Sequence, residues 1–296
     1  MIEKMTPSRV IFNILNYAYM ILVCIVCVAP IWHVLMSSLS NPRSLMAAGG
    51  GLVLWPKGQP TLAGYQLTFK NPSIFTGYFN TIIYVISTTV LGAVLTTMAG
   101  FVLSRKTKLK KLLTIFILFT MMFSGGLIPS FMVNLKLGLV NTRLAIILPG
   151  VINAFYITIM KSAFEQLPES FEESARLDGA GPLTIMIRIL VPLIKATIAV
   201  VVMFTIVQQW NSWFPASIYL QKRRDYWPLQ LFMREILVQN DTTRILSGTE
   251  AAAKADMVSN LVKYCVSIVG TLPILIVYPF AQKYFVTGVT LGGVKG

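Results

Sequence analysis

Few residues in this sequence have the types and spacing that metal binding, phosphate binding or catalysis requires. The cysteines are the first candidates. Cys24 and Cys27 form a C-x2-C pair inside an apolar run, without a second such pair, and His33 is the single histidine. A structural zinc ion takes four ligands, so we interpret these cysteines as small packed or lipid-facing residues. Bulky Val23 before Cys24 argues against a lipid-attachment site. The sequence predicts no metal site and no resident cofactor.

The sequence does not contain a P-loop for binding phosphates or a set of residues suited to catalysis either. The tail sequence Gly293-Val294-Lys295 lacks the adjacent glycine and lysine, and the following hydroxyl, with which a P-loop cradles phosphates. The apolar runs hold no arrangement of acid, histidine and nucleophile suited to an intramembrane enzyme. We therefore expect no catalytic residues and no hydrolysis by this chain itself.

A polar segment between two long apolar runs, residues 165–193, predicts two short helices joined by a tight corner. Pro168 suits the first turn of a helix, and the glutamates around it favour the positive end of the helix dipole. Gly179 would end this helix in a left-handed turn, and Pro182 would begin the next one. Glu172 and Arg176 are spaced to form an ion pair. An aromatic and small residues share another face: Phe171, Ser174, Ala175 and Asp178.

Such a helix pair at a membrane surface is suited to docking a partner, and the alternative is a solvated loop. The segment resembles the EAA loop of membrane subunits of ATP-binding-cassette (ABC) importers. Glu173-Ser174-Ala175, three residues, Gly179, nine residues, Ile189, one residue, then Val191-Pro192 follow its spacing. The loop usually has alanine where Ser174 stands and leucine where Val191 stands. Residues 175–180 and the tail 282–296 resemble the carbohydrate-importing branch, and the resemblance runs from the second apolar run to the last residue.

The resemblance implies an all-α integral membrane protein with the type I ABC importer permease fold, in which 165–193 is a cytoplasmic coupling loop. It implies a second homologous permease, an external solute-binding protein, and two cytoplasmic ATPase subunits that bind the ATP. The implied substrate is a carbohydrate, an oligosaccharide in particular. In maltose-importing members, the smaller membrane subunit, which this chain resembles, leaves substrate contact within the membrane to its partner.

The resemblance also implies roles for individual residues. Glu173 would pair with a basic residue of the ATPase, and Gly179 would permit the turn between the coupling helices. The residues implied to couple to the ATPase are Glu173, Ser174, Ala175, Asp178, Gly179, Ala180 and Pro192. The residues implied to contact it from the tail are Gly292 and Lys295.

Composition independently predicts a membrane protein. Hydrophobic residues make up 55% of the 296 residues and charged residues 12%, and the mean hydropathy is +0.70, values that a soluble domain would not sustain. The net charge of +14 is scattered over short loops. That distribution argues against a nucleic-acid-binding stripe and favours contact with anionic lipid headgroups.

Hydropathy divides the chain into six apolar runs, and a span needs about 20 residues to cross about 30 Å of hydrocarbon. They predict one transmembrane domain over 1–296, and the resemblance implies that it lies in a bacterial cytoplasmic (inner) membrane. Residues 104–111 hold five basic residues and no acid, so this loop and both termini are predicted to be cytoplasmic. The loop 37–77, rich in glycine and proline, is predicted to be aqueous and external. The predicted spans are 11–36, 78–103, 112–133, 144–160, 192–213 and 264–281.

Glycines in the third span suggest a point of flexibility. Gly125, Gly126 and Pro129 should break the helix toward its outer end. We interpret them as a hinge in an outer gate, the alternative being a simple helix terminus.

Amides and tryptophan gather at the outer end of the fifth span and suggest a substrate path. Gln208, Trp210 and Asn211 could contact a sugar, because aromatic faces stack on sugar rings and amides bind hydroxyls. They could equally be an interface anchor and interhelical contacts.

The outer segment 215–263 carries apolar residues at helical spacing between positions 229 and 237, which predicts an amphipathic helix on the outer interface or against a neighbour. Pro273 and Pro279 predict kinks in the last span. Two alternatives to the sugar importer stay open: an ABC importer for another solute, and an ion-coupled secondary transporter. The latter usually has ionisable residues at the bilayer midplane, which these spans almost lack.

Overall fold

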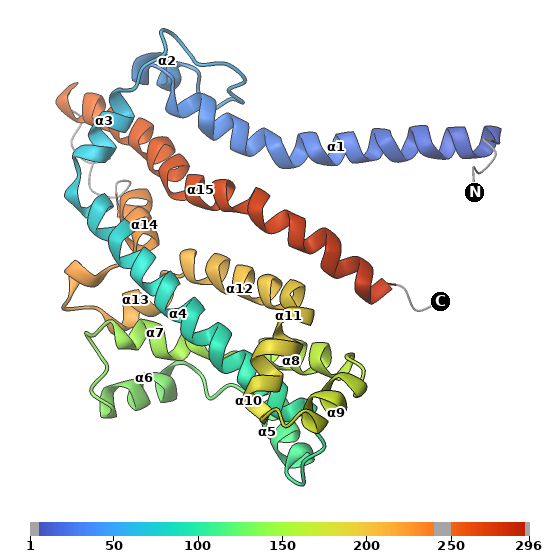
Figure 1. The fold of residues 1–296 in the computed structure, drawn as a ribbon. Helices are drawn as coiled ribbons and strands as arrows, with labels where there is room; N and C mark the ends of the chain where they lie inside the picture. The colour runs from blue at the N-terminus through green and yellow to red at the C-terminus, as the bar shows by residue number, and fades with distance from the viewer. Residues whose placement is uncertain (1–5, 240–249, 294–296) are drawn as a thin grey trace. The chain divides into compact units, whose positions relative to one another are not determined.

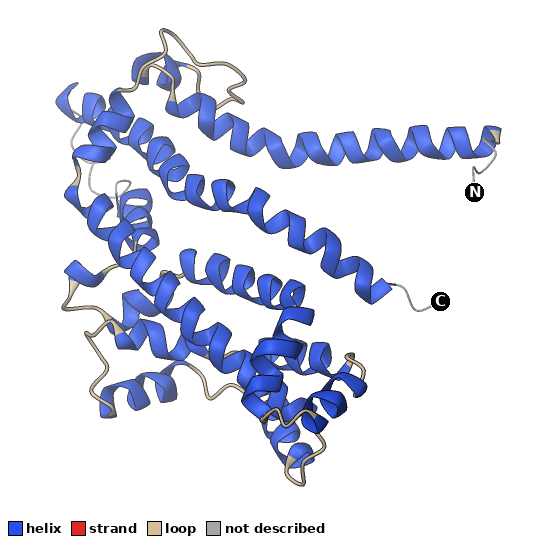
Figure 2. Cartoon of the chain, viewed as in Figure 1, coloured by secondary structure: helices blue, strands red, loops and turns tan. Residues whose placement is uncertain are grey.

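The computed structural model describes residues 6–239 and 250–293, and the side chains of residues 6–238 and 257–279. Within these ranges the chain consists of helices and loops, with no strand (Figures 1 and 2). The helices are α1 (Pro7–Ser38), α2 (Pro42–Ala47), α3 (Ala63–Lys70), α4 (Pro72–Ser104), α5 (Lys110–Met122), α6 (Leu127–Lys136), α7 (Leu144–Val151), α8 (Ala154–Glu165), α9 (Ser170–Leu177), α10 (Pro182–Thr184), α11 (Val191–Leu193), α12 (Lys195–Trp210), α13 (Phe214–Tyr219), α14 (Leu229–Gln239) and α15 (Glu250–Gly293). A π-helix spans Ile185–Leu190 and a 3-10 helix spans Arg224–Tyr226.

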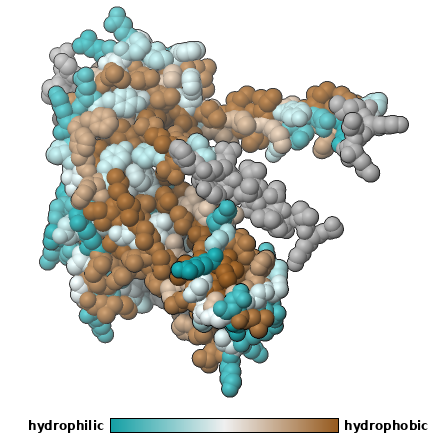
Figure 3. Space-filling model, in the orientation of Figure 1, coloured by the Kyte–Doolittle hydropathy of each residue, from teal (hydrophilic) through white to brown (hydrophobic). Residues whose placement is uncertain are grey.

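Several of these helices are suited to a membrane. Four described segments are long and apolar enough to cross one: Pro7–Ser38, Pro72–Ser104, Leu144–Glu165 and Met257–Pro279. Two bent pairs pass the same test together, Lys110–Met122 with Leu127–Lys136 and Pro182–Leu193 with Lys195–Trp210, which gives up to six spans. Apolar side chains predominate on the visible surface (Figure 3). The all-helical membrane class is thus confirmed, and the six-span topology stays a prediction.

The predicted external loop 37–77 contains more regular structure than its composition indicated. It holds α2 and α3, and α4 begins at Pro72, six residues before the predicted start of the second span at 78. Asn41 caps α2, where its side-chain oxygen accepts a hydrogen bond from the Arg43 amide at 3.1 Å. Pro42 and Pro72 open helices here. Proline fits the first turn of a helix, so the residues that suggested irregular loop act as helix starts.

The chain divides into two compact units, the first made of 1–71 with 235–271 and the second of 72–234 with 272–296. In the first unit, His33 has a structural role: its Nδ1 accepts a hydrogen bond from the Val53 amide at 3.0 Å, and its ring meets Tyr264 edge-on. Cys24 and Cys27 are exposed on α1. Among the described residues, no three metal-ligating side chains come together.

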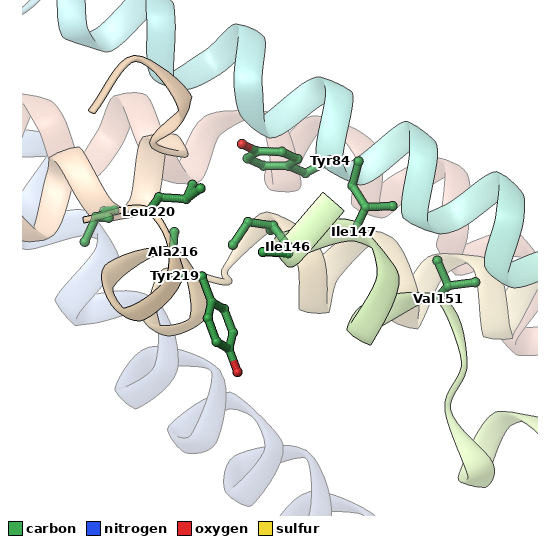
Figure 4. Close-up of a cluster of buried hydrophobic side chains, with 9 residues drawn as sticks. Tyr84, Ile146, Ile147, Val151, Ala216, Tyr219 and Leu220 are labelled. Atoms are coloured by element: carbon green, nitrogen blue, oxygen red, sulfur yellow. The ribbon is translucent and has the colours of Figure 1, made fainter. Parts of the chain in front are cut away.

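In the second unit, α4 is the central helix, and α7, α8 and α12 pack against it (Figure 1). Glycines on α4 permit this close packing. A Cβ added at Gly92 would lie 2.9 Å from the Val151 carbonyl oxygen, and one at Gly100 would lie 2.6 Å from the Met160 Cβ. Tyr84 of α4, Ile146 and Ile147 of α7 and Leu220 after α13 form the buried cluster in Figure 4. This packing holds the elements of the functional site.

The amphipathic helix predicted in the outer segment exists as α14, but its apolar face packs on the chain's own α4. Leu229, Phe232 and Met233 are buried. A Cβ added at Gly77 of α4 would lie 2.8 Å from the Leu229 Cα. The prediction of a helix on the interface or against a neighbour was therefore wrong for this face, since a periodic pattern does not identify the covering surface.

A polar network fastens the segment before α14 to the second unit. The buried Asn80 amide donates to the carbonyl oxygens of Asp225 at 2.7 Å and Trp227 at 3.1 Å, and its oxygen accepts from the Arg143 Nη2 at 2.9 Å. The Arg143 guanidinium also lies 4.6 Å from the centre of the Tyr226 ring. The Asn80 amide, the two carbonyls and the Arg143 guanidinium thus provide hydrogen-bond partners for one another, and each would be costly to bury without a partner.

Because of this network, we expect Asn80→Leu to destabilise the protein by about 3 kcal/mol, since it removes three hydrogen bonds and strands the Arg143 guanidinium. Thermal unfolding of the purified protein in detergent measures the effect. Thr76→Val is the matched control, because Thr76 lies one turn away on α4, is half-buried, and its hydroxyl donates to the Pro72 carbonyl of the same helix. Equal unfolding temperatures for the two variants would contradict the role of the network.

Candidate functional site

The polar segment 165–193 forms the predicted pair of helices with a tight corner. Helix α9 ends at Leu177, and Gly179 has φ +83°, the left-handed conformation that glycine was predicted to supply. The Ala180 amide donates to the Ala175 carbonyl at 2.9 Å and the Gly179 amide to the Arg176 carbonyl at 3.0 Å, which is the Schellman arrangement. Pro182 then opens α10. The predicted corner and the helix start at Pro182 are confirmed, whereas Pro168 lies before the N-cap Glu169 of α9 and not in the first turn of the helix.

The corner presents apolar side chains beside polar ones. Leu177 is 89% exposed and Leu183 is 62% exposed, although large apolar side chains are costly to leave in water. We call this the corner surface, defined by Phe171, Glu173, Ser174, Leu177, Asp178 and Leu183, all of them exposed. Exposed apolar residues rimmed by polar ones are typical of a docking surface.

The other residues predicted to couple to the ATPase, Ala175, Ala180 and Pro192, differ in burial. Ala175 is buried in a cluster with Met160, Phe164 and Ile185, so its small side chain serves packing of α9 onto α8 and the π-helix. Ala180 is half-buried and Pro192 is exposed. Ala175 therefore supports the corner surface from behind.

Ion pairs join this segment to the basic loop 104–111. Glu172 pairs with Arg105 of the loop and with Arg176 on α9, the latter at 2.5 Å, which confirms the predicted pair. The Glu172 side chain is only 11% exposed. Lys106 bonds Glu169 at 2.7 Å and Lys110 bonds Glu165 at 2.7 Å. We call these contacts between the loop and 165–172 the ion-pair tether.

The tether was not predicted, because the basic loop was interpreted only as a topology marker. Its exposed members favour their charged forms. The hydrogen bond from Lys106 lowers the pKa of Glu169, and the same contact raises the pKa of Lys106. A carboxyl group whose pKa is lowered by folding stabilises the folded state at pH values above the usual glutamate pKa. This stabilisation is lost as the pH falls through the lowered pKa. The tether is therefore intact at neutral pH.

A cavity of about 630 Å³ lies in the second unit between α6, α7, α12 and α13. It brings together Gly125 and Pro129, predicted as a gate, with Gln208, predicted on a substrate path. No charged side chain is among its lining residues. Two of the three predicted gate residues and one predicted path residue thus line the same cavity, and Gly126 is not among its lining residues.

The structure separates the other two predicted path residues from this cavity. Trp210 is buried, and its ring centre lies 6.0 Å from that of Tyr78. The Asn211 amide nitrogen donates to the Val207 carbonyl at 2.9 Å, at the exposed end of α12. Neither residue lines the cavity.

Two buried amides also line the cavity, Gln209 and Asn134, and neither was among the three predicted path residues. A pattern could have indicated Gln209, because Val201, Thr205 and Gln209 recur every fourth residue and form the buried stripe of α12. Asn134 had no comparable indication, since α6 was taken as the end of the third span.

The break that forms one wall of the cavity lies where the sequence predicted it. Helices α5 and α6 meet at 114° across residues 123–126. Gly126 has φ 86° and ψ 179°, a region that is essentially confined to glycine. A Cβ on Gly125 would make only an ordinary contact with Pro129 at 3.7 Å. Gly126 is thus the residue that requires glycine.

Comparison with known proteins gives a consistent result. Residues 92–291 match the family described as binding-protein-dependent transport system inner membrane component. A polygalacturonan/rhamnogalacturonan transport system permease protein of Bacillus subtilis is 33% identical over 97% of this chain and 99% of its own length. A trehalose/maltose transport system permease protein of Thermococcus litoralis is 28% identical over 98% of this chain and 99% of its own.

A solved structure agrees in fold. The chain matches a crystal structure of a bacterial ABC transporter involved in the import of the acidic polysaccharide alginate, with a TM-score of 0.84 and 28% identity. The match covers 96% of this chain and 99% of that one.

Proposed function

The chain belongs to the family of binding-protein-dependent transport system inner membrane components, and from this we propose that it couples ATP hydrolysis by partner subunits to the import of a carbohydrate. Members of this family are the permease components of ABC importers, which are transport proteins, not enzymes. The observation that carries the proposal is the corner surface, whose helix α9 is held by the ion-pair tether to the loop 104–111 between α4 and α5.

The corner surface is proposed to dock a cytoplasmic ATPase subunit. Glu173 is exposed and forms no ion pair with a described residue, so its charge is available to a basic residue of a partner. Leu177 and Leu183 would bury their apolar side chains in the same contact. ATP can drive transport only if the ATP-bound and resting ATPases differ in affinity for the two membrane conformations.

The topology proposed from the basic loop supports this docking. Residues 104–111 are predicted to be cytoplasmic, and the tether joins them to α9, so both would face the same compartment. We propose that both termini are cytoplasmic as well. Gly292 lies in α15, in the part whose surroundings the structure does not describe, and Lys295 lies outside the described residues. Their contact with the ATPase is therefore proposed from the family resemblance alone.

The proposed complex contains this chain, a second permease of related fold, two ATP-binding subunits and an external solute-binding protein. A carbohydrate substrate is supported by relatives named for polygalacturonan/rhamnogalacturonan and for trehalose/maltose transport. The cavity supports it too, since about 630 Å³ falls in the range of about 300–1,000 Å³ typical of small-ligand sites.

Uptake by the reconstituted complex tests this function. Proteoliposomes containing all the subunits, with the solute-binding protein outside, would be offered labelled maltodextrin, arabino-oligosaccharide and oligogalacturonate in turn. We expect at least one to enter only when ATP is supplied to the ATPase side. Entry that persists without ATP and collapses with an ion gradient would favour a secondary transporter and overturn the proposal.

The break before α6 gives a prediction about the gate. We expect Gly126→Ala to slow ATP-driven uptake severalfold, because a Cβ in this backbone conformation costs about 1–3 kcal/mol and would shift the wall of the cavity. Gly125→Ala is the matched control, because its added methyl meets nothing closer than 3.7 Å. Initial uptake rates in the same proteoliposomes measure both, and an unchanged rate for Gly126→Ala would remove the hinge role.

A further inference from the structure

We propose that the cavity of the second unit is a binding subsite for one uncharged sugar unit of the transported carbohydrate, and that the buried amides of Gln209 and Asn134 bind its hydroxyls. The inference rests on the proposed function and adds that this chain itself contacts the substrate. The family resemblance implied the reverse, a smaller membrane subunit that leaves this contact to its partner.

The first observation is an unmade hydrogen bond at Asn134. Its side chain is buried, at 8% exposure, and its amide nitrogen donates to the Ser130 carbonyl at 2.9 Å. Its Oδ1 is buried without a hydrogen-bond partner in the described structure. Leaving a buried acceptor unpaired costs about 1–3 kcal/mol, so a donor that reached this atom from the cavity would be favoured. A sugar hydroxyl is such a donor.

The second observation is the amide of Gln209, which lines the cavity from α12. Gln209 is 9% exposed, and its side chain makes no hydrogen bond with a described residue. A Cβ added at Gly150 would lie 3.3 Å from the Gln209 Oε1 and 3.2 Å from the Thr88 Cγ2. The missing side chain at Gly150 therefore leaves the amide room beside α7. An amide offers both a donor and an acceptor, which suits a hydroxyl.

The rest of the lining limits the ligand to an uncharged group. Hydroxyl-bearing residues in the lining are Ser130, Ser212 and Tyr219, and apolar surface comes mainly from prolines and aliphatic residues. A carboxylate brought here would lose its water without gaining a cation, which is strongly unfavourable. A sugar ring combines hydroxyls at its edge with C–H groups on its faces and matches both kinds of surface. Acidic units of a polysaccharide would have to lie elsewhere along the path.

Photolabelling of the assembled complex tests the inference. Maltodextrin and arabino-oligosaccharide carrying a diazirine would be supplied with the solute-binding protein and ATP, then illuminated, and the labelled peptides identified by mass spectrometry. We expect label within residues 125–150 and 208–219 of this chain. An excess of the unlabelled neutral oligosaccharide should remove it, and oligogalacturonate should not.

Variants add a functional measurement. We expect Gln209→Leu and Asn134→Leu each to lower saturating ATP-driven uptake about tenfold, with ATP hydrolysis within twofold of the original complex. Both substitutions keep the approximate size of the side chain. Asn211→Leu is the matched control, because that amide lies two residues from Gln209 and outside the cavity, and its uptake should not change.

The outcomes separate the two proposals. Intact ATP-driven uptake with label only on the partner permease, or equal competition by oligogalacturonate, would overturn the uncharged subsite and leave the proposed function standing. Unchanged uptake in both leucine variants would do the same, and would indicate that water satisfies Asn134. Failure of the original complex to import any of the three sugars with ATP would overturn the proposed function and this inference with it.

Discussion

Replacing Gly179 with leucine is expected to reduce ATP-driven uptake at least tenfold while the complex still assembles and hydrolyses ATP. Gly179 has φ +83°, and no atom lies within 4 Å of the position a Cβ would take. The effect therefore comes from the backbone: a left-handed conformation costs an L-residue about 1–2 kcal/mol, and relief of that strain would turn α9 away from its orientation relative to α10. The corner surface would then no longer move with the membrane helices.

Gly181→Leu is a stringent control for this result. Gly181 lies two residues away with φ −74° and ψ 161°, which any residue adopts, and it too has open space around it. The same side chain is thus added to the same corner without backbone strain. Uptake and ATP hydrolysis measured on one preparation should separate the variants, and equal losses would show that bulk at the surface, not the turn, is responsible.

The second large effect is expected at Glu172. Glu172→Gln keeps the shape of the side chain and removes the charge that bridges Arg105 and Arg176. The Arg105 side chain is only 22% exposed, and its Nε and Nη2 are already without a hydrogen-bond partner in the described structure. Breaking one side of a buried pair costs about 3–5 kcal/mol. We expect a lower unfolding temperature, together with loss of coupling between hydrolysis and uptake.

At the adjacent Glu173, we expect a loss of coupling without a loss of stability. Glu173→Gln makes the same chemical change on the exposed side of α9, where the carboxylate forms no ion pair with a described residue. We expect an unchanged unfolding temperature and a loss of coupling. Thermal unfolding and uptake of the two variants are the measurements. A drop in stability for Glu173→Gln, or none for Glu172→Gln, would reverse the assigned roles.

Local geometry was the part of the fold that the sequence predicted best. The left-handed turn at Gly179 and the break at Gly126 depend on glycine's access to positive φ, and the start of α10 on the fixed φ of Pro182, so a few neighbouring residues determine each. Proline was ambiguous for the same reason. Pro42 and Pro72 in the predicted loop 37–77 begin helices, and only the residues that follow distinguish a helix start from a turn.

Contacts between distant residues were beyond the sequence. Arg105 and Glu172 are 67 residues apart, and nothing in either local pattern relates them. The face of α14 was predicted, but the surface that covers it was not, because amphipathic periodicity is the same for a helix on lipid and a helix on α4. Gln208 and Gln209 both line the cavity although successive residues of a helix point about 100° apart, and the sequence did not indicate that Gln209 is the buried amide of the two.

Cross-linking at the corner surface tests whether this surface docks an ATP-binding subunit. Cys24 and Cys27 would be replaced with serine, Ser174 with cysteine, and a photoreactive maleimide attached in the assembled complex, Cys265 being buried. We expect a cross-link from position 174 to an ATP-binding subunit, with a yield that changes between the ATP-bound and resting states. Robust ATP-driven uptake by the same preparation without any cross-link from the corner surface to an ATP-binding subunit would contradict it.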